Sequence, residues 1–456
     1  MAPQHFFYRA GFGVAPGTNT SLAVRETLAQ SAMNKPIAVV EPVDAEGLRL
    51  RGMSPDERKQ MLQKSRKTVL QLNQAWLAQM ANDATCLREK MTLFWHDHFA
   101  CRTLFAPLAQ KQNNTLRHHA LGSFRQLLQA IAKDPAMLQF LNNQQNRKDS
   151  PNENFAREVM ELFTLGRGHY TEEDVKEAAR AFTGWAFNPM TTDFLFRTRQ
   201  HDDGVKTFRG QRGRWGGEDI VDMLLEDKQT ARFVVGKIWK SFVSDQPPEP
   251  EIAEALAADF FRWDYDIARL MESLYTSSWF YENRFRASRI KTPVELLAGI
   301  LVQTGGRFQE EVAPLFIQRA LGQVLFYPPN VGGWPQGPEW IDSSSLTFRL
   351  SLPSLLFSER ETDFQAKDDG DANNLTNGFR GKNLALAVDW KKWADVFTKQ
   401  STAKTLEAIS AVLLARPLFA SQTARALRFV ETARTDEEVV RQSYLALMSL
   451  PEYQLC

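Results

Sequence analysis

Apolar residues recur every three or four positions over most of this chain, and few stretches alternate apolar and polar residues for long enough to predict a strand. This period is that of one face of an α-helix. The sequence therefore predicts an all-α protein: a large multi-helix domain with long irregular loops and a C-terminal helical segment. The predicted helices include residues 66–82, 87–99, 123–133, 218–225, 230–242, 251–261 and 294–304, with shorter helices between residues 403 and 448.

The clearest helix is predicted to begin at Ser150 and to end at Gly166. Ser150 and Glu153 have the spacing of a capping box, and a glycine at the end permits the left-handed stop. A second helix is predicted between Thr171, which has the spacing of a cap, and Gly184. The two would form a helical hairpin.

The composition changes between Glu359 and Lys382, where Asp, Asn and Gly largely replace large apolar residues. Such a composition is typical of a solvated loop. We therefore predict a main helical domain at residues 1–358 that carries the functional site, a polar linker or loop at residues 359–383, and a C-terminal helical segment at residues 384–456 that packs on the main body.

Two imidazoles and a carboxylate, His96, Asp97 and His98, interrupt an otherwise apolar run. A neutral imidazole nitrogen binds transition metals, and a nearby carboxylate can be a ligand or can orient the ring. Residues two apart on a helix point roughly 200° away from each other. Both histidines could therefore bind one ion only if the helix ends or unwinds there. The alternative is that one histidine is hydrogen-bonded in the core and the other meets solvent.

Glu158 and Glu161 lie three positions apart, so they point the same way from a predicted helix. Carboxylates with this spacing can share a cation or work as an acid and base pair. A solvated face with Arg157 as counter-ion would explain Glu161 readily and Glu158 less readily.

His201, Asp202 and Lys206 belong to a glycine-flanked stretch that predicts a loop. Six Lys or Arg against two Asp between Arg197 and Arg214 make it the most basic local stretch. A loop offering imidazole, carboxylate and ammonium groups could form a site for an anionic ligand. A charged surface loop is the alternative.

Prolines and glycines between Tyr327 and Ile341 exclude a regular element and predict a rigid loop, which carries Asn330 and Trp334. Rigid aromatic loops often line grooves for sugars or peptides, where flat rings stack on the ligand. They also plug the ends of helical bundles, and both interpretations stay open.

The composition, with 43% hydrophobic and 24% charged residues, is typical of a folded soluble protein. Lys and Arg total 55 against 54 acids, a net charge of +1, so we expect no nucleic-acid partner. No apolar run reaches the roughly 18 residues of a membrane span. The three cysteines form no disulfide framework and no C-x-x-C pair. The first residues lack the features of a secretory signal, which favours a cytoplasmic location.

Several stretches, in this order, resemble a bacterial family known as domain of unknown function 1800, and the resemblance covers nearly the whole chain. It implies a large, mainly helical protein without an assigned reaction, often exported and so periplasmic, and often encoded beside a second uncharacterised protein that would be its partner. The stretches are residues 9–13 (RAGFG), 94–99 (FWHDHF), 151–166 (PNENFAREVMELFTLG), 170–175 (YTEEDV), 178–185 (AARAFTGW), 201–202 with 206–210 (HD, KTFRG), 328–335 (PPNVGGWP) and 451–454 (PEYQ).

The leading hypothesis from the residues is a metal-dependent enzyme, a hydrolase or an oxidoreductase, in which these polar segments meet in one helical cleft. The alternative is a non-catalytic binding or assembly protein that holds a polymer or partner protein with its aromatic loop, its histidines and glutamates forming a buried polar network. In the enzyme hypothesis the ligands of a divalent metal ion are His96 or His98, Glu158, and His201 or Asp202. Glu161 and Asp202 are the candidate catalytic residues, with Glu161 orienting a ligand or acting as the base. Lys206 holds an anionic group of the substrate, and the further candidate binding residues are Arg157, Asn330 and Trp334.

Overall fold

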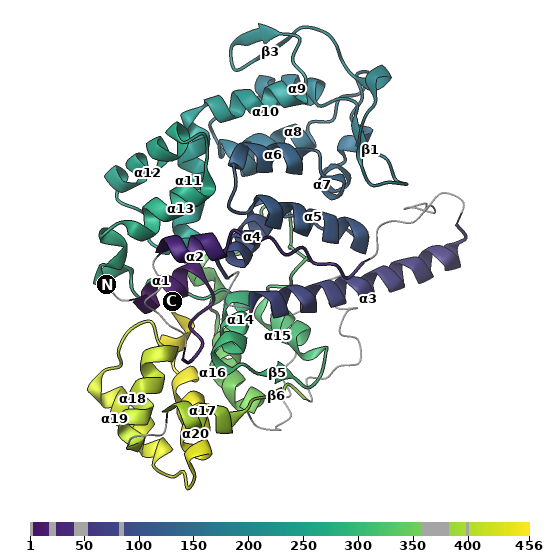
Figure 1. Ribbon diagram of the computed structural model, residues 1–456. Helices are drawn as coiled ribbons and strands as arrows, with labels where there is room; N and C mark the ends of the chain where they lie inside the picture. The colour runs from purple at the N-terminus through teal and green to yellow at the C-terminus, as the bar shows by residue number, and fades with distance from the viewer. Residues whose placement is uncertain (1–2, 18–23, 41–52, 82–85, 358–382, 398–400) are drawn as a thin grey trace.

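The computed structural model describes residues 3–17, 24–40, 53–81, 86–357, 383–397 and 401–456. Helices dominate this part of the chain, and the strands in it form three two-stranded sheets (Figure 1). The predicted all-α fold is confirmed. No helix among these residues is long and apolar enough to cross a membrane. The strands are β1 (Trp185–Phe187), β2 (Phe194–Phe196), β3 (Lys206–Phe208), β4 (Gln211–Gly213), β5 (Arg307–Phe308) and β6 (Leu386–Ala387).

Hydrophobic periodicity and caps located several helices well. The predictions for α4, α6, α10, α11, α12 and α14 agree with the structure to within two residues at each end. The helices of the first half are α1 (Pro3–Ala10), α2 (Val24–Gln30), α3 (Pro55–Met80), α4 (Cys86–His98), α5 (Ala106–His119), α6 (Phe124–Ala132), α7 (Pro135–Phe140), α8 (Asn154–Glu158), the π-helix η3 (Val159–Thr164), α9 (Glu172–Ala181) and α10 (Gly217–Glu226). Those of the second half are α11 (Lys228–Phe242), α12 (Pro250–Arg262), α13 (Ile267–Thr276), α14 (Pro293–Thr304), α15 (Ala313–Leu321), α16 (Ser343–Phe357), α17 (Trp390–Phe397), α18 (Thr402–Leu413), α19 (Ala420–Val430) and α20 (Asp436–Met448).

The helix predicted from Ser150 begins later than expected, at Asn154. Ser150 forms a bridge with Arg147, and the Asn152 N–H donates to the Asn146 side chain, so the backbone there is committed to a turn. The predicted capping box is therefore wrong. The helix becomes the π-helix η3 after Glu158, whereas the Thr171 cap of α9 is confirmed. α3 also differs, because it begins at Pro55 and not at residue 66.

The described residues pack around two hydrophobic cores, and Figure 1 shows most helices of one core above those of the other. The upper core gathers mainly α4 to α13, and the lower core gathers α3 and α14 to α20. α4 supplies residues to both: Trp95 belongs to the upper core and Leu93 to the lower one. Every residue of α4 except Asp97 is buried. A helix without a solvated face must satisfy its polar side chains inside the protein.

The C-terminal segment packs on the main body through the lower core. β6 pairs antiparallel with β5, and the Trp393 indole N–H donates to the Thr304 carbonyl at 2.7 Å. The Tyr444 hydroxyl donates to the Gln303 carbonyl at 3.1 Å. Residues 358–382, and so nearly all of the predicted linker, lie outside the described residues. One hydrophobic core therefore spans the predicted boundary.

Candidate functional site

His96 and His98 leave α4 in different directions, as the helical geometry predicts. His96 Nε2 accepts a hydrogen bond from the Phe326 N–H at 3.0 Å, and its ring lies against Trp76 and Trp334. His98 Nε2 donates to the Phe163 carbonyl at 3.1 Å. Burial lowers the pKa of His96 to about 3 and the pKa of His98 well below its usual value. Both rings are therefore neutral, and each joins α4 to a different segment.

Asp97, between the two histidines, holds the loop that follows α15. Its Oδ1 accepts the Trp334 N–H at 2.7 Å, and its Oδ2 accepts the Gln336 amide at 2.6 Å. Gly333 lies against the same carboxylate with φ +86°, and a Cβ there would lie 2.3 Å from Asp97 Oδ1. Glycine is required both for this conformation and for this close approach. The structure thus brings together two of the conspicuous sequence segments, 94–99 and 327–341.

Burial raises the pKa of Asp97 to about 6, although its hydrogen bonds and the charge of Lys237 oppose the rise. The folded protein then holds this proton more tightly than the unfolded chain. The contribution of Asp97 to the free energy of unfolding is lost as the pH rises from about 4 to about 6, because its carboxyl group ionises at a lower pH in the unfolded chain. Two pKa units correspond to about 3 kcal/mol.

We expect Asp97→Asn to remove this component of the pH dependence. Urea unfolding between pH 4 and pH 7 gives the free energy of unfolding of the wild type and the variant. The expected difference is in the slope of this free energy against pH. The matched control is Asp395→Asn, an exposed position on α17, which should leave the slope unchanged. Parallel curves for the wild type and Asp97→Asn would contradict the assignment.

Trp334 and Asn330 do not present an aromatic surface for stacking. The Trp334 side chain is 5% exposed and packs against the His96 ring. Asn330 is exposed, but its Oδ1 accepts the Gly332 N–H at 2.8 Å and so shapes the turn. In this geometry the loop packs onto α4, the second of the two roles left open by its sequence.

Glu158 directly precedes the π-helix and Glu161 lies within it, and the two have different surroundings. Glu161 accepts hydrogen bonds from the Tyr170 hydroxyl and from Arg167 Nε. Burial and the neighbouring Glu161 raise the pKa of Glu158. Arg157 turns away to form a two-pronged ion pair with Glu172, with both distances 2.8 Å.

The loop of His201 is fixed by its own contacts. His201 Nδ1 donates to the Thr183 carbonyl at 2.9 Å, and Asp202 pairs with Arg180 at 2.8 Å. Lys206 is buried and donates to the carbonyls of Asp202 and Gly204, so its ammonium group stabilises the loop. α9 packs against both α8 and β3, and Figure 1 shows it between the Glu158 helix and this hairpin.

No three His, Cys, Asp or Glu side chains among the described residues lie together in a way that could hold a metal ion. The imidazoles of His96, His98 and His201 are each engaged in a hydrogen bond with the backbone. The described geometry therefore gives no support to the metal ligand set, and the divalent ion stays a prediction.

A different polar site lies where the two cores meet, and we call it the junction pocket. Its cavity is about 40 Å³ and partly open to solvent. Each core supplies part of the wall, and Asp97 forms one side. The lining residues are Lys90, Leu93, Phe94, Asp97, Ser241, Phe242, Arg289, Thr292, Glu295, Gln323 and Gln336.

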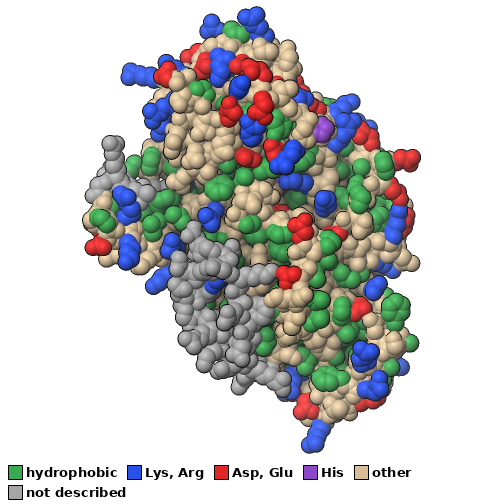
Figure 2. All heavy atoms as spheres, turned by 180° about the vertical axis from the view of Figure 1, so that it is seen from behind, with side chains coloured by type: hydrophobic (Ala, Val, Ile, Leu, Met, Phe, Trp, Pro, Cys, Tyr) green, Lys and Arg blue, Asp and Glu red, His purple; other side chains and the backbone are tan. Residues whose placement is uncertain are grey.

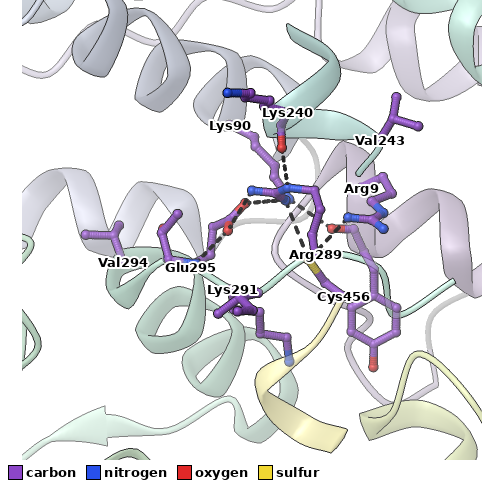
Figure 3. A network of polar contacts seen from close by, with 12 residues as sticks. Arg9, Lys90, Lys240, Val243, Arg289, Lys291, Val294, Glu295 and Cys456 are labelled. Atoms are coloured by element: carbon purple, nitrogen blue, oxygen red, sulfur yellow. Dashed lines mark hydrogen bonds and ion pairs between the residues drawn. The ribbon is translucent and has the colours of Figure 1, made fainter. Parts of the chain in front are cut away.

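Lys90 and Arg289 pair with Glu295 in this wall, as Figure 3 shows. Lys90 Nζ lies 3.1 Å from Glu295 Oε1 and also donates to the carbonyls of Tyr8 and Gly11. Arg289 donates to both Glu295 oxygens and to the Lys240 carbonyl. Burial acts to raise the pKa of Glu295, but the charges of Arg289 and Lys90 outweigh it and hold the pKa well below its usual range.

Three further buried cations lie near Lys90 and Arg289, and we call these five side chains the cationic network. Burial lowers the pKa of Arg9 to about 10, of Lys291 to about 8 and of Arg349 to about 10. The Lys291 ammonium lies 3.8 Å from the centre of the Tyr453 ring, a cation–π contact. Each of the five interacts electrostatically with Glu295. The cationic network is Arg9, Lys90, Arg289, Lys291 and Arg349 (Figure 3 labels four of the five).

The charges of this network do not balance among the described residues. Among the side chains that the structure describes, the buried Glu295 carboxylate interacts with it, and the half-buried Asp245 adds a second. The Cys456 thiol accepts hydrogen bonds from Arg9 and Arg289. The five cations outnumber these two carboxylate side chains. Several donors are also buried without a hydrogen-bond partner: Arg9 Nε, Arg349 Nε, Arg349 Nη2 and Gln454 Nε2.

Comparison with protein families finds one whose model, described as "Protein of unknown function (DUF1800)", matches residues 5–455. The chain belongs to this family. Neither the comparison with curated proteins nor the comparison with solved structures returned a match. The match confirms the resemblance predicted from the motifs, and DUF1800 membership assigns no reaction.

Sequence reasoning about this DUF1800 chain missed the cationic network. Lys90 was part of the helix predicted at residues 87–99 and Glu295 part of the helix predicted at residues 294–304, which it caps with Thr292 in the structure. One signal was present: Arg88, Glu89 and Lys90 are consecutive charges in a helix that the flanking apolar residues make hydrophobic all round.

Proposed function

We propose that this protein binds a small oxyanion, or the carboxylate or phosphate group of a larger ligand, in the junction pocket. The observation that carries the proposal is the excess of buried cations over buried anions, with Lys90 and Arg289 exposed to one cavity. A buried ion without a counter-ion costs several kcal/mol. A bound anion would offset that cost.

The size and donors of the pocket support the same ligand class. A cavity of about 40 Å³ has room for about three water molecules, since each needs roughly 10 to 15 Å³. An oxyanion of four or five atoms is comparable. Gln323, whose Oε1 accepts the Val294 N–H, lines the same cavity and carries amide donors, and Ser241 adds a hydroxyl.

Asp97 links binding to protonation. An ionised Asp97 in the pocket wall repels an anion, whereas a protonated one can donate a hydrogen bond to it. The other charged groups that line the pocket are Lys90, Arg289 and Glu295, and the charge of Lys237 on α11 also acts on Asp97. None of these four is expected to change its charge between pH 5 and pH 7. We expect the affinity to fall as the pH rises through about 6.

The test is thermal unfolding in sulfate, phosphate or acetate, with chloride as the reference at the same ionic strength. An anion that binds only the folded state stabilises it by about 2.7 kcal/mol at 100 times its Kd. Ser241→Leu fills the cavity and should abolish the specific stabilisation. Ser344→Leu, the same change at an exposed position of α16, should preserve it. Equal responses to all anions, or an unchanged response in Ser241→Leu, would refute the proposal.

A further inference from the structure

A second pocket lies where α18 and the turn after it approach α1. Its volume is about 520 Å³, within the range of small-molecule sites. It shares no lining residue with the junction pocket. We call it the C-terminal pocket, and its occupant is independent of the function proposed above.

One part of its wall is apolar and continuous. Leu406 projects from α18, and Leu414, Pro417 and Leu418 follow in the turn between α18 and α19. Phe419, directly after them, is 66% exposed, the largest exposed fraction among the large hydrophobic residues described. This surface favours an aliphatic group, because burying apolar area is the main source of affinity for such ligands.

The remaining wall is cationic. Arg286, Lys404 and Arg416 line the pocket against one carboxylate, Glu407. Arg416 lies 3.8 Å from Glu452 and is partly compensated. Arg286 donates to the Tyr281 carbonyl through Nη2, while its Nε is buried without a hydrogen-bond partner.

His5 closes the inner end of the pocket. Its side chain is 2% exposed and lies against Phe280, with 4.6 Å between ring centres. Burial, followed by the charges of Arg9 and Arg286, lowers the pKa of His5 to about 3, so the ring is neutral. Its ring nitrogens are buried and make no hydrogen bond of ordinary geometry. A neutral imidazole and a free guanidinium N–H next to each other can both donate to one carboxylate.

We propose that the C-terminal pocket binds an amphipathic carboxylate, with its aliphatic chain along the Leu406 and Leu414 wall and its carboxylate facing Arg286 and Lys404. Charge complementarity selects an anion, and the apolar wall selects a chain. A ligand with only one of these features would satisfy half of the lining.

Isothermal titration of the full chain with octanoate tests this, with 1-octanol and acetate as ligands that carry the chain alone and the charge alone. We expect saturable binding of one octanoate, at least about tenfold tighter than either control, the effect of one charge-assisted contact. Octanoate that fails to saturate overturns the proposal, and so does 1-octanol that binds equally well.

Two pairs of variants locate the site. Ala411→Trp adds a ring on the lining face of α18 and should abolish octanoate binding, while Ala408→Trp, an exposed position of the same helix outside the lining, should keep it. Lys404→Gln should weaken octanoate about tenfold and leave 1-octanol unchanged, whereas Lys391→Gln on α17 should change neither.

Both tryptophan variants change exposed positions, and their far-UV circular dichroism should match the wild type. Loss of octanoate binding in Ala408→Trp, or its retention in Ala411→Trp, would overturn the assignment. Ser241→Leu should leave octanoate binding intact, so the two proposals fail independently.

Discussion

Replacing Glu89 by Gln is expected to lower the free energy of unfolding by about 3 to 5 kcal/mol. Glu89 and Arg117 are both fully buried, and Arg117 Nε lies 3.0 and 3.1 Å from the two carboxylate oxygens. The same carboxylate accepts the Trp76 indole N–H and the Gln79 amide. The glutamine keeps the shape but leaves the Arg117 charge without its counter-ion in the interior.

Urea unfolding at pH 7 measures this effect. The matched control is Glu254→Gln, which breaks an ion pair with Arg232 whose side chains are 57% and 48% exposed. Exposed pairs contribute at most about 1 kcal/mol. A loss for Glu89→Gln as small as that of the control would show that Arg117 is satisfied without it.

The second large effect is expected for Glu295→Gln, again a loss of about 3 to 5 kcal/mol. Lys90 and Arg289 lose the carboxylate they share, and the excess of positive charge in the cationic network increases. Because the pKa of Glu295 is lowered on folding, its contribution is present above the unfolded pKa of about 4 and is lost as the pH falls further. The variant should therefore lose less stability than the wild type on acidification below about pH 4.

Glu251→Gln on α12 is the control for Glu295→Gln, because Glu251 also lies in the first turn of a helix but is exposed. The Glu251→Gln variant should lose less than about 1 kcal/mol of unfolding free energy, the usual size of a helix-dipole contribution.

The proposed anion site predicts that sulfate stabilises Glu295→Gln more than the wild type, since a bound anion replaces the missing charge. A sulfate effect that decreases in the variant would count against the site.

The candidate site shows how far sequence reasoning reached. Helical geometry correctly separated the two imidazoles of α4, and the 94–99 and 327–341 segments proved to be neighbours. The expected grouping was different, however: the hypothesis joined His96, Glu158 and His201. Distance along a helix constrains which side chains share a face, but it carries no information on which distant loop covers that face.

The sequence by itself determined several of the helices, because periodic apolar positions and caps such as Thr171 with Asp174 act over a few residues. It also determined the family. Only the tertiary structure decided which charges are buried. Lys90 and Glu295 are 205 positions apart, and Arg9 and its acceptor Cys456 are 447 apart, so these contacts depend on how the two cores meet around α4. A charged residue in a helix has the same local pattern whether it faces water or the interior, and the free energy that distinguishes the two comes from desolvation and long-range partners.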